Sequence, residues 1–238
     1  MSVLVALLAL TATATASDAP TVVQAGVDRS LSRADGTALR LEGRGSVGRV
    51  GVQVGADWTH AVYAGDAVLP DIATRRVALR AAAGPRLVGP GGAEVMVHVG
   101  ILLDSSAITG RTYRALAAQG FYTDAAAFGA GVGAGALGVL PFRPNGAWAF
   151  AWSVQGSRSS YWRLRQPLSR SRSSLEEQGF PPSDRRERAT ASVAVAPSLQ
   201  LRVRYLQLNA GPTLRYGGAA GGAHPTLGFG GAIGVWTP

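Results

Sequence analysis

The chain has 238 residues, enough for one barrel or one ordinary domain, and 47% of them are apolar. It contains no Cys, which excludes disulfides, thiolate metal sites and Cys nucleophiles. The formal net charge is +9 and all 23 basic residues are Arg, but they are scattered without interleaved aromatic residues, which argues against a nucleic-acid partner.

The N-terminal segment is typical of a secretory signal peptide. An apolar run over residues 3–10 leads into small residues, and Ala14-Thr15-Ala16 provides an A-x-A cleavage site before Ser17. No Lys or Arg precedes the apolar run, so either the α-amino group supplies the positive charge or translation starts upstream. A short buried helix or strand is the alternative. The sequence therefore predicts a signal peptide over 1–16.

The rest of the chain repeats one pattern, in which every second residue is apolar. In residues 93–104 one face is apolar throughout, and the other carries Glu94, Met96, His98, Gly100 and Asp104, with Leu102 as the exception. A period of two indicates a strand, because successive side chains leave opposite faces. Apolar outer faces and charged inner faces are what a membrane-spanning barrel requires.

Nine clear alternating segments and one weak one follow in chain order. The weak segment is 21–30, and the clear ones are 39–47, 50–59, 76–81, 93–104, 128–140, 147–154, 191–203, 206–215 and 227–235. Glycines alternate along one face of 128–140, which suggests a narrow lumen; a transmembrane helix over 125–142 is the alternative.

The connections between the segments differ in length. Short ones fall near Gly48, Gly89, Asn145 and Arg204, and long ones fall near residues 65, 119 and 171. Outer-membrane barrels have short periplasmic turns, longer extracellular loops and an even number of strands. The predicted fold class is therefore all-β, a transmembrane antiparallel up-and-down β-barrel of about ten strands, with eight possible. The predicted outer-membrane barrel spans residues 17–238.

These features together resemble a known class of protein. The signal segment, the alternating strands and the segments LRVRYLQLNAGPTLRYGG (201–218) and TLGFGGAIGVW (226–236) are similar to small porin-like outer-membrane β-barrel proteins of Gram-negative bacteria. The resemblance implies a non-catalytic porin-like or membrane-structural role in the cell envelope. It also implies contact with outer-membrane lipid and lipopolysaccharide, and insertion by the barrel assembly machinery. Family members usually end on an aromatic residue, whereas here Trp236 falls on the inward face and is followed by Thr237 and Pro238.

The inward faces of the predicted strands carry a set of charged side chains. Unpaired charges in a narrow lumen are costly, so we expect Arg–carboxylate pairing and a salt-bridged polar core. A conducting, anion-preferring pore is the alternative. The predicted lumen charge network is Arg40, Glu42, Arg44, Arg76, Arg80, Glu94, His98 and Arg215.

Two further functions remain open at this point. A His oriented by an Asp at the extracellular rim could activate water or Ser, as in barrel enzymes, although no protease or acyltransferase motif of that class is present. The other alternative is a soluble lipocalin-like ligand-binding barrel with the charged face outward. No catalytic residue, metal or cofactor is predicted. The candidate rim residues are Asp57, His60, Asp104, Ser105 and His224.

An Arg-rich stretch over 156–188 is predicted to be the longest irregular segment. Arg forks bind phosphate well, so this loop is expected to contact lipopolysaccharide phosphates; a merely solvated loop is the alternative. Its basic residues are Arg158, Arg163, Arg165, Arg170, Arg172, Arg185, Arg186 and Arg188.

Overall fold

The fold is seen in a computed structural model that describes residues 21–30, 34–63, 72–109, 126–165, 189–219 and 224–237. The predicted signal peptide over 1–16 lies outside the described residues. So do the centres of the long connections predicted near residues 65, 119 and 171.

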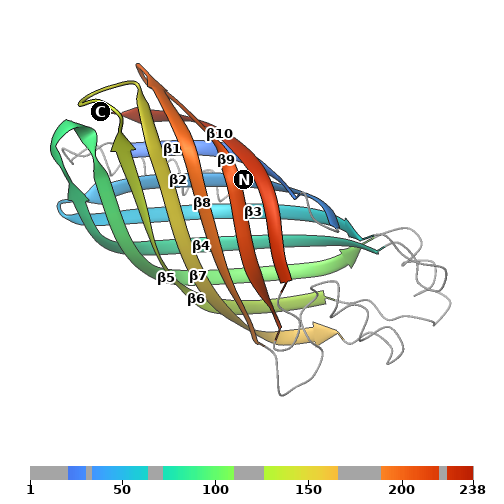
Figure 1. The fold of residues 1–238 in the computed structure, drawn as a ribbon. Helices are drawn as coiled ribbons and strands as arrows, with labels where there is room; N and C mark the ends of the chain where they lie inside the picture. Colours follow the sequence, from blue (N-terminus) through green and yellow to red (C-terminus); the bar gives the residue numbers. More distant parts are fainter. Residues whose placement is uncertain are drawn as a thin grey trace.

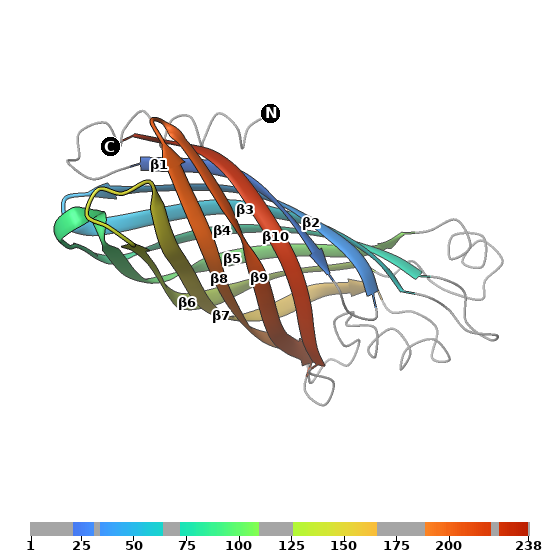
Figure 2. The same ribbon diagram turned by 45° about the horizontal axis from the view of Figure 1, so that its top comes forward.

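The described residues form one closed barrel of antiparallel strands (Figures 1 and 2). Each strand pairs with its neighbours in the sequence, and β1 pairs with β10 to close the barrel. The predicted all-β, ten-stranded up-and-down barrel is therefore confirmed, including the weak first strand. The strands are β1 (Thr21–Ser30), β2 (Ala34–Val47), β3 (Val50–Tyr63), β4 (Ile72–Val88), β5 (Glu94–Thr109), β6 (Ala126–Pro141), β7 (Trp148–Arg165), β8 (Ala189–Val203), β9 (Leu206–Ala219) and β10 (His224–Thr237).

The outer wall is apolar and the polar side chains point inward. On β5, Val99 is 67% exposed on the outer face, whereas His98 is buried in the lumen. Leu102, the exception in the sequence pattern, is also buried on the inward face. A soluble carrier would bury its apolar face inside, so this arrangement contradicts the lipocalin-like alternative.

Several strands are longer than the alternating pattern predicted. β7 continues to Arg165 although its apolar alternation stops at Val154, and β5 continues to Thr109. The prediction of an irregular segment over 156–188 is therefore wrong for its first ten residues, 156–165, which belong to β7. The physical reason is that the hydrogen-bonded ladder needs no apolar alternation, which is required only where one face meets lipid.

Glycine on β6 allows the strands to approach closely. A Cβ on Gly131 would lie 2.3 Å from the carbonyl oxygen of Arg158, and one on Gly135 would lie 2.4 Å from that of Val154. The strand conformation of β6 contradicts the alternative of a transmembrane helix over 125–142. Within the described ranges, no helix is long and apolar enough to cross a membrane.

Four tight connections gather at one end of the barrel, called the turn end below (upper left in Figure 1). They are residues 48–49, 89–93, 142–147 and 204–205, and β1 begins and β10 finishes at the same end, where Thr21 pairs with Thr237. Asn145 and Arg204 adopt positive φ angles of 55° and 52°, which the tight reversals there require. The opposite end, where β1 finishes and β10 begins, is called the loop end.

Candidate functional site: the charged lumen

The inward faces of the strands bring a dense set of charges into the lumen. All eight residues of the predicted network lie on inward positions of β2, β4, β5 and β9. Five further charged side chains also point into the lumen, as their ion pairs, burial or ring contact show. These additional residues are Asp28, Asp57, Arg86, Asp104 and Arg202.

Arg40 links two carboxylates in the middle of the lumen. Its Nε donates to Asp57 Oδ1 at 3.0 Å, and its Nη2 lies 3.2 Å from Asp28 Oδ2. Asp28 is shared with Arg215, whose Nη2 lies 3.5 Å from the same oxygen. Four strands, β9, β1, β2 and β3, are therefore joined through side chains that alternate in charge.

Arg80 continues this chain across the barrel. Its Nη1 donates to Gln155 Oε1 on β7 at 2.8 Å, and its Nη2 donates to Glu42 Oε2 on β2 at 3.2 Å. Nη1 also lies 3.8 Å from Asp57 Oδ2, and Arg44 Nε lies 3.8 Å from Glu42 Oε1. We call the connected set the central chain; it contains Arg215, Asp28, Arg40, Asp57, Arg80, Glu42 and Arg44.

Two further ion pairs flank the central chain. Toward the loop end, Arg76 Nε donates to Asp104 Oδ1 at 2.9 Å, and Asp104 is fully buried. Toward the turn end, Arg86 Nε lies 2.9 Å from Glu94 Oε1, and Arg86 Nη1 donates to Ser46 Oγ at 3.0 Å. Among the described residues the inward set contains seven Arg and five carboxylates, an excess of two positive charges.

The lumen is packed shut near the turn end. Met96 and Val139 are each 1% exposed, and Val22, Leu137 and Ala149 are also buried there. These inward apolar side chains, which we call the turn-end plug, lie beside the Arg86–Glu94 pair. In a barrel this narrow, side chains alone can fill the interior.

Trp236 also points into the lumen, as the alternation on β10 predicted. It pairs with inward Val22 across the β1–β10 closure, and the Arg202 guanidinium carbon lies 4.9 Å from the centre of its ring. Arg202 Nε donates to Gln207 Oε1 at 3.2 Å, so the cation is held between an amide and an aromatic face. The ring of Trp236 therefore lies inside the barrel beside the β1–β10 pairing and covers the Arg202 guanidinium.

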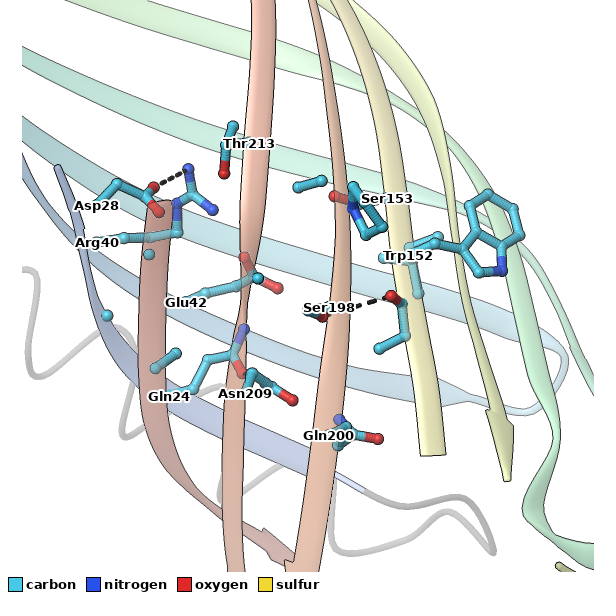
Figure 3. Close-up of a pocket in the computed structure, with 18 of the residues that line it drawn as sticks. Gln24, Asp28, Arg40, Glu42, Trp152, Ser153, Ser198, Gln200, Asn209 and Thr213 are labelled. Atoms are coloured by element: carbon cyan, nitrogen blue, oxygen red, sulfur yellow. Dashed lines mark hydrogen bonds and ion pairs between the residues drawn. The ribbon is translucent and has the colours of Figure 1, made fainter. Parts of the chain in front are cut away.

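A small polar cavity of about 150 Å³ remains between the plug and the central chain (Figure 3). Gln24, Asn209 and Gln200 line one side of it, and the Asn209 amide donates to Gln24 Oε1 at 2.8 Å. His98 Nδ1 and Gln200 Oε1 are buried without a hydrogen-bond partner among the described residues. The volume suits a few water molecules, at about 30 Å³ each, which would satisfy such groups. Trp152 points away from this cavity, outward over Gly138.

The described members of the predicted rim site do not converge. Asp57 and Asp104 are inside the barrel and pair with Arg, whereas Ser105 is exposed on the outer wall. His60 also faces outward and stacks on Trp58, with ring centroids 6.1 Å apart. The rim assignment fails because β3 continues to Tyr63 and β5 to Thr109, beyond the predicted ends at 59 and 104. Asp57 and Asp104 therefore lie well inside the strands and not at the rim. The side chain of His224 lies outside the described residues, and within them no group of three or more His, Cys, Asp or Glu could hold a metal ion.

The predicted Arg-rich loop is divided by the structure. Arg158 is exposed on the outward face of β7, and Arg163 and Arg165 belong to the same strand. The remaining five, Arg170, Arg172, Arg185, Arg186 and Arg188, lie outside the described residues.

Comparison with known proteins identifies the fold but no sequence family. No family model matches the chain, and no curated protein matches it. The translocator domain of the autotransporter NalP from Neisseria meningitidis superposes with a TM-score of 0.50 at 10% identity, covering 97% of this chain and 92% of that one. The β-domain of the Bordetella autotransporter BrkA gives 0.44 at 14% identity over 92% and 99%, and Ail of Yersinia pestis gives 0.38 at 10% over 93% and 100%. The likeness to the NalP domain, together with the closed strand order, shows that this chain has the fold of a Gram-negative outer-membrane β-barrel.

Proposed function

We propose that this chain is a sealed, non-catalytic barrel that stands in the outer membrane and has a membrane-structural role. The turn end faces the periplasm, as short turns do in this class of barrel. A closed barrel can stand in hydrocarbon, because it satisfies its backbone hydrogen bonds internally. Its outward apolar side chains are then in contact with lipid. The predicted signal peptide over 1–16 would deliver the chain across the inner membrane, and the barrel assembly machinery would insert it.

The observation that carries this proposal is the central chain of ion pairs. It crosses the lumen from Gln155 on β7 through Arg80 to Glu42 on β2, and it extends to β1 and β9 through Asp28. Every charge of the central chain has an oppositely charged neighbour within 3.8 Å, which offsets the cost of placing these groups in a low-dielectric interior. The turn-end plug closes the same lumen a second time.

Conduction of anions is the second candidate, and it is favoured by the excess of two positive charges inside. The turn-end plug opposes it, because Met96 and Val139 lie in the path that an ion would have to take. The plug equally opposes passage of a polypeptide, the role that the name of the NalP translocator domain suggests for that protein.

Single-barrel recordings in planar lipid bilayers test the choice. The wild-type barrel should show no stable conductance steps. Arg80→Ser should introduce them or raise the leak, because it disconnects the two sides of the central chain, whereas Arg49→Ser, in an exposed turn, should leave the recording silent. Stable anion-selective steps from the wild type would overturn the sealed-barrel proposal in favour of a porin.

Fractionation tests the location separately. The protein should be recovered with the outer membrane, and the folded form should migrate faster than the heated form on a semi-native gel. Recovery of a detergent-free soluble monomer would exclude a membrane-embedded barrel.

A further inference from the structure

An apolar groove of about 720 Å³ runs over the outer wall where β10, β1, β2, β3 and β4 lie side by side. Three of the outward positions that line it, Ala25, Ala56 and Gly231, have no side chain beyond Cβ, whereas larger apolar neighbours flank them. The wall is therefore hollowed where small residues cluster. The larger outward side chains that flank them are Val27, Leu39, Leu41, Trp58, Val77 and Ile233.

A polar and basic row borders the groove on its loop-end side. The strand register places Arg29 opposite Thr37, Thr37 opposite His60, and His60 opposite Arg75, all on the outer face. The preceding outward row, one step of two residues or about 6.7 Å nearer the turn end, is Val27, Leu39, Trp58 and Val77, which lines the groove. Arg29 and Arg75 are exposed, and His60 stacks on Trp58 at the border between the two rows.

This juxtaposition has the chemistry of a lipid site. The groove offers an apolar surface for an acyl chain, and the row next to it offers two guanidinium groups, which bind phosphate oxygens through paired N–H donors. An apolar tail joined to an anionic head distinguishes a lipid from a free anion. A free anion would need only the Arg residues.

The separation of the two cations narrows the choice of headgroup. Arg29 on β1 and Arg75 on β4 are three strand spacings apart, about 14 Å between their backbones. That spacing suits two separate phosphates better than one. We propose that this outer wall binds the diphosphorylated lipid A of lipopolysaccharide, with an acyl chain in the groove and its phosphates on Arg29 and Arg75. The inference rests on the proposed placement in the outer membrane with the loop end outward.

Titration of the folded barrel in detergent micelles with diphosphoryl lipid A, read by native mass spectrometry, tests this site. Arg29→Ser combined with Arg75→Ser should weaken binding about tenfold or more, because two charge-assisted contacts are lost. Ala25→Leu combined with Ala56→Leu should also weaken it, because the new side chains fill the groove. Arg49→Ser combined with Arg143→Ser, two exposed Arg residues in turn-end connections away from the groove, is the matched control and should change binding by no more than about twofold.

Titrations with other lipids and with inorganic phosphate distinguish a lipid site from a free-anion site. Affinity should fall from diphosphoryl to monophosphoryl lipid A and again to phosphatidylglycerol, and inorganic phosphate should not compete. Competition by inorganic phosphate at similar concentration would show a free-anion site and overturn the lipid assignment. Heat-modifiable migration shows that each variant is folded.

Unchanged binding by either the double Arg variant or the groove-filled variant, each folded, would also overturn the proposal. Conductance by the wild-type barrel would contradict only the sealed lumen, since none of these variants touches an inward residue. The two proposals can therefore fail independently.

Discussion

The two ends of the lumen hold their charged side chains in different surroundings. At the turn end, Met96 and Val139 are 1% exposed and the Arg86–Glu94 pair is buried among them, so packing excludes water. At the loop end, the side chains of Arg76 and Arg215 are 46% and 40% exposed, so their charges remain in contact with solvent. Where water is excluded, a charged side chain needs a close partner, which is a carboxylate for Arg86 and an amide with an aromatic face for Arg202. Where water enters, hydration stabilises Arg76 and Arg215 together with their carboxylate partners.

The largest expected effect comes from breaking the buried pair at the turn end. Glu94→Ala leaves the Arg86 charge buried without its carboxylate, and we expect the free energy of unfolding in lipid to fall by about 3–5 kcal/mol. Urea titration of the vesicle-inserted barrel measures this loss. Adding Arg86→Met should restore most of it, because the buried charge is then removed. A single variant as stable as the wild type would mean that water reaches the turn end.

Removing part of the turn-end plug should have a slightly smaller effect. Met96→Ala leaves a cavity in a packed interior, and we expect a loss of about 2–5 kcal/mol in the same titration. A Cβ on Gly51 would lie only 2.7 Å from the Sδ of Met96. Gly51→Ala should therefore be tolerated better in the Met96→Ala background than alone. Equal costs of Gly51→Ala in both backgrounds would show that the two residues are not in contact.

On the outer wall, the cost of an introduced charge should also fall toward the loop end. Val99→Arg places a charge in the apolar band of β5 and should cost about 2–4 kcal/mol in lipid. Ser105→Arg, on the same outward face nearer the loop end, should cost only about 0–1 kcal/mol, because the headgroup region solvates it. Paired unfolding titrations in vesicles compare the two. A tolerant position 99 with an intolerant position 105 would invert the depth assignment.

The smallest effect is expected from the loop-end charge. Arg215→Ser removes one neighbour of Asp28, but Arg40 still contacts that carboxylate at 3.2 Å and water can reach the site. We expect a change of about 0–1 kcal/mol, as for exposed ion pairs. A loss as large as that of Glu94→Ala would show that the loop end is as dry as the turn end.

The strand positions and their inward faces follow from the sequence because a period of two is a local property. Glu94, His98 and Asp104 share a face of β5 whatever the strand pairs with. The count of about ten needs one more argument, because nine segments alternate clearly and the weak segment 21–30 is added to reach the even number that closure requires. The placement of the tight turns follows from turn residues such as Gly48 and Asn145. The extent of the strands does not, since residues 155–165 pair with β6 and β8 where no apolar alternation marks them.

The partners of the inward charges were decided only by the closed barrel. Arg80 meets Gln155 across 75 residues of sequence, and Gln24 meets Asn209 across 185. Asp57 and Asp104 have inward parity in the sequence, yet which Arg each one meets depends on strand number, register and closure. The sequence by itself therefore determined the architecture, the lipid-facing wall and the charged interior, because alternation is read one strand at a time. The tertiary structure decided which charges pair, where the lumen is closed and where the outer wall is hollowed, because each of these depends on residues from strands that only closure brings together.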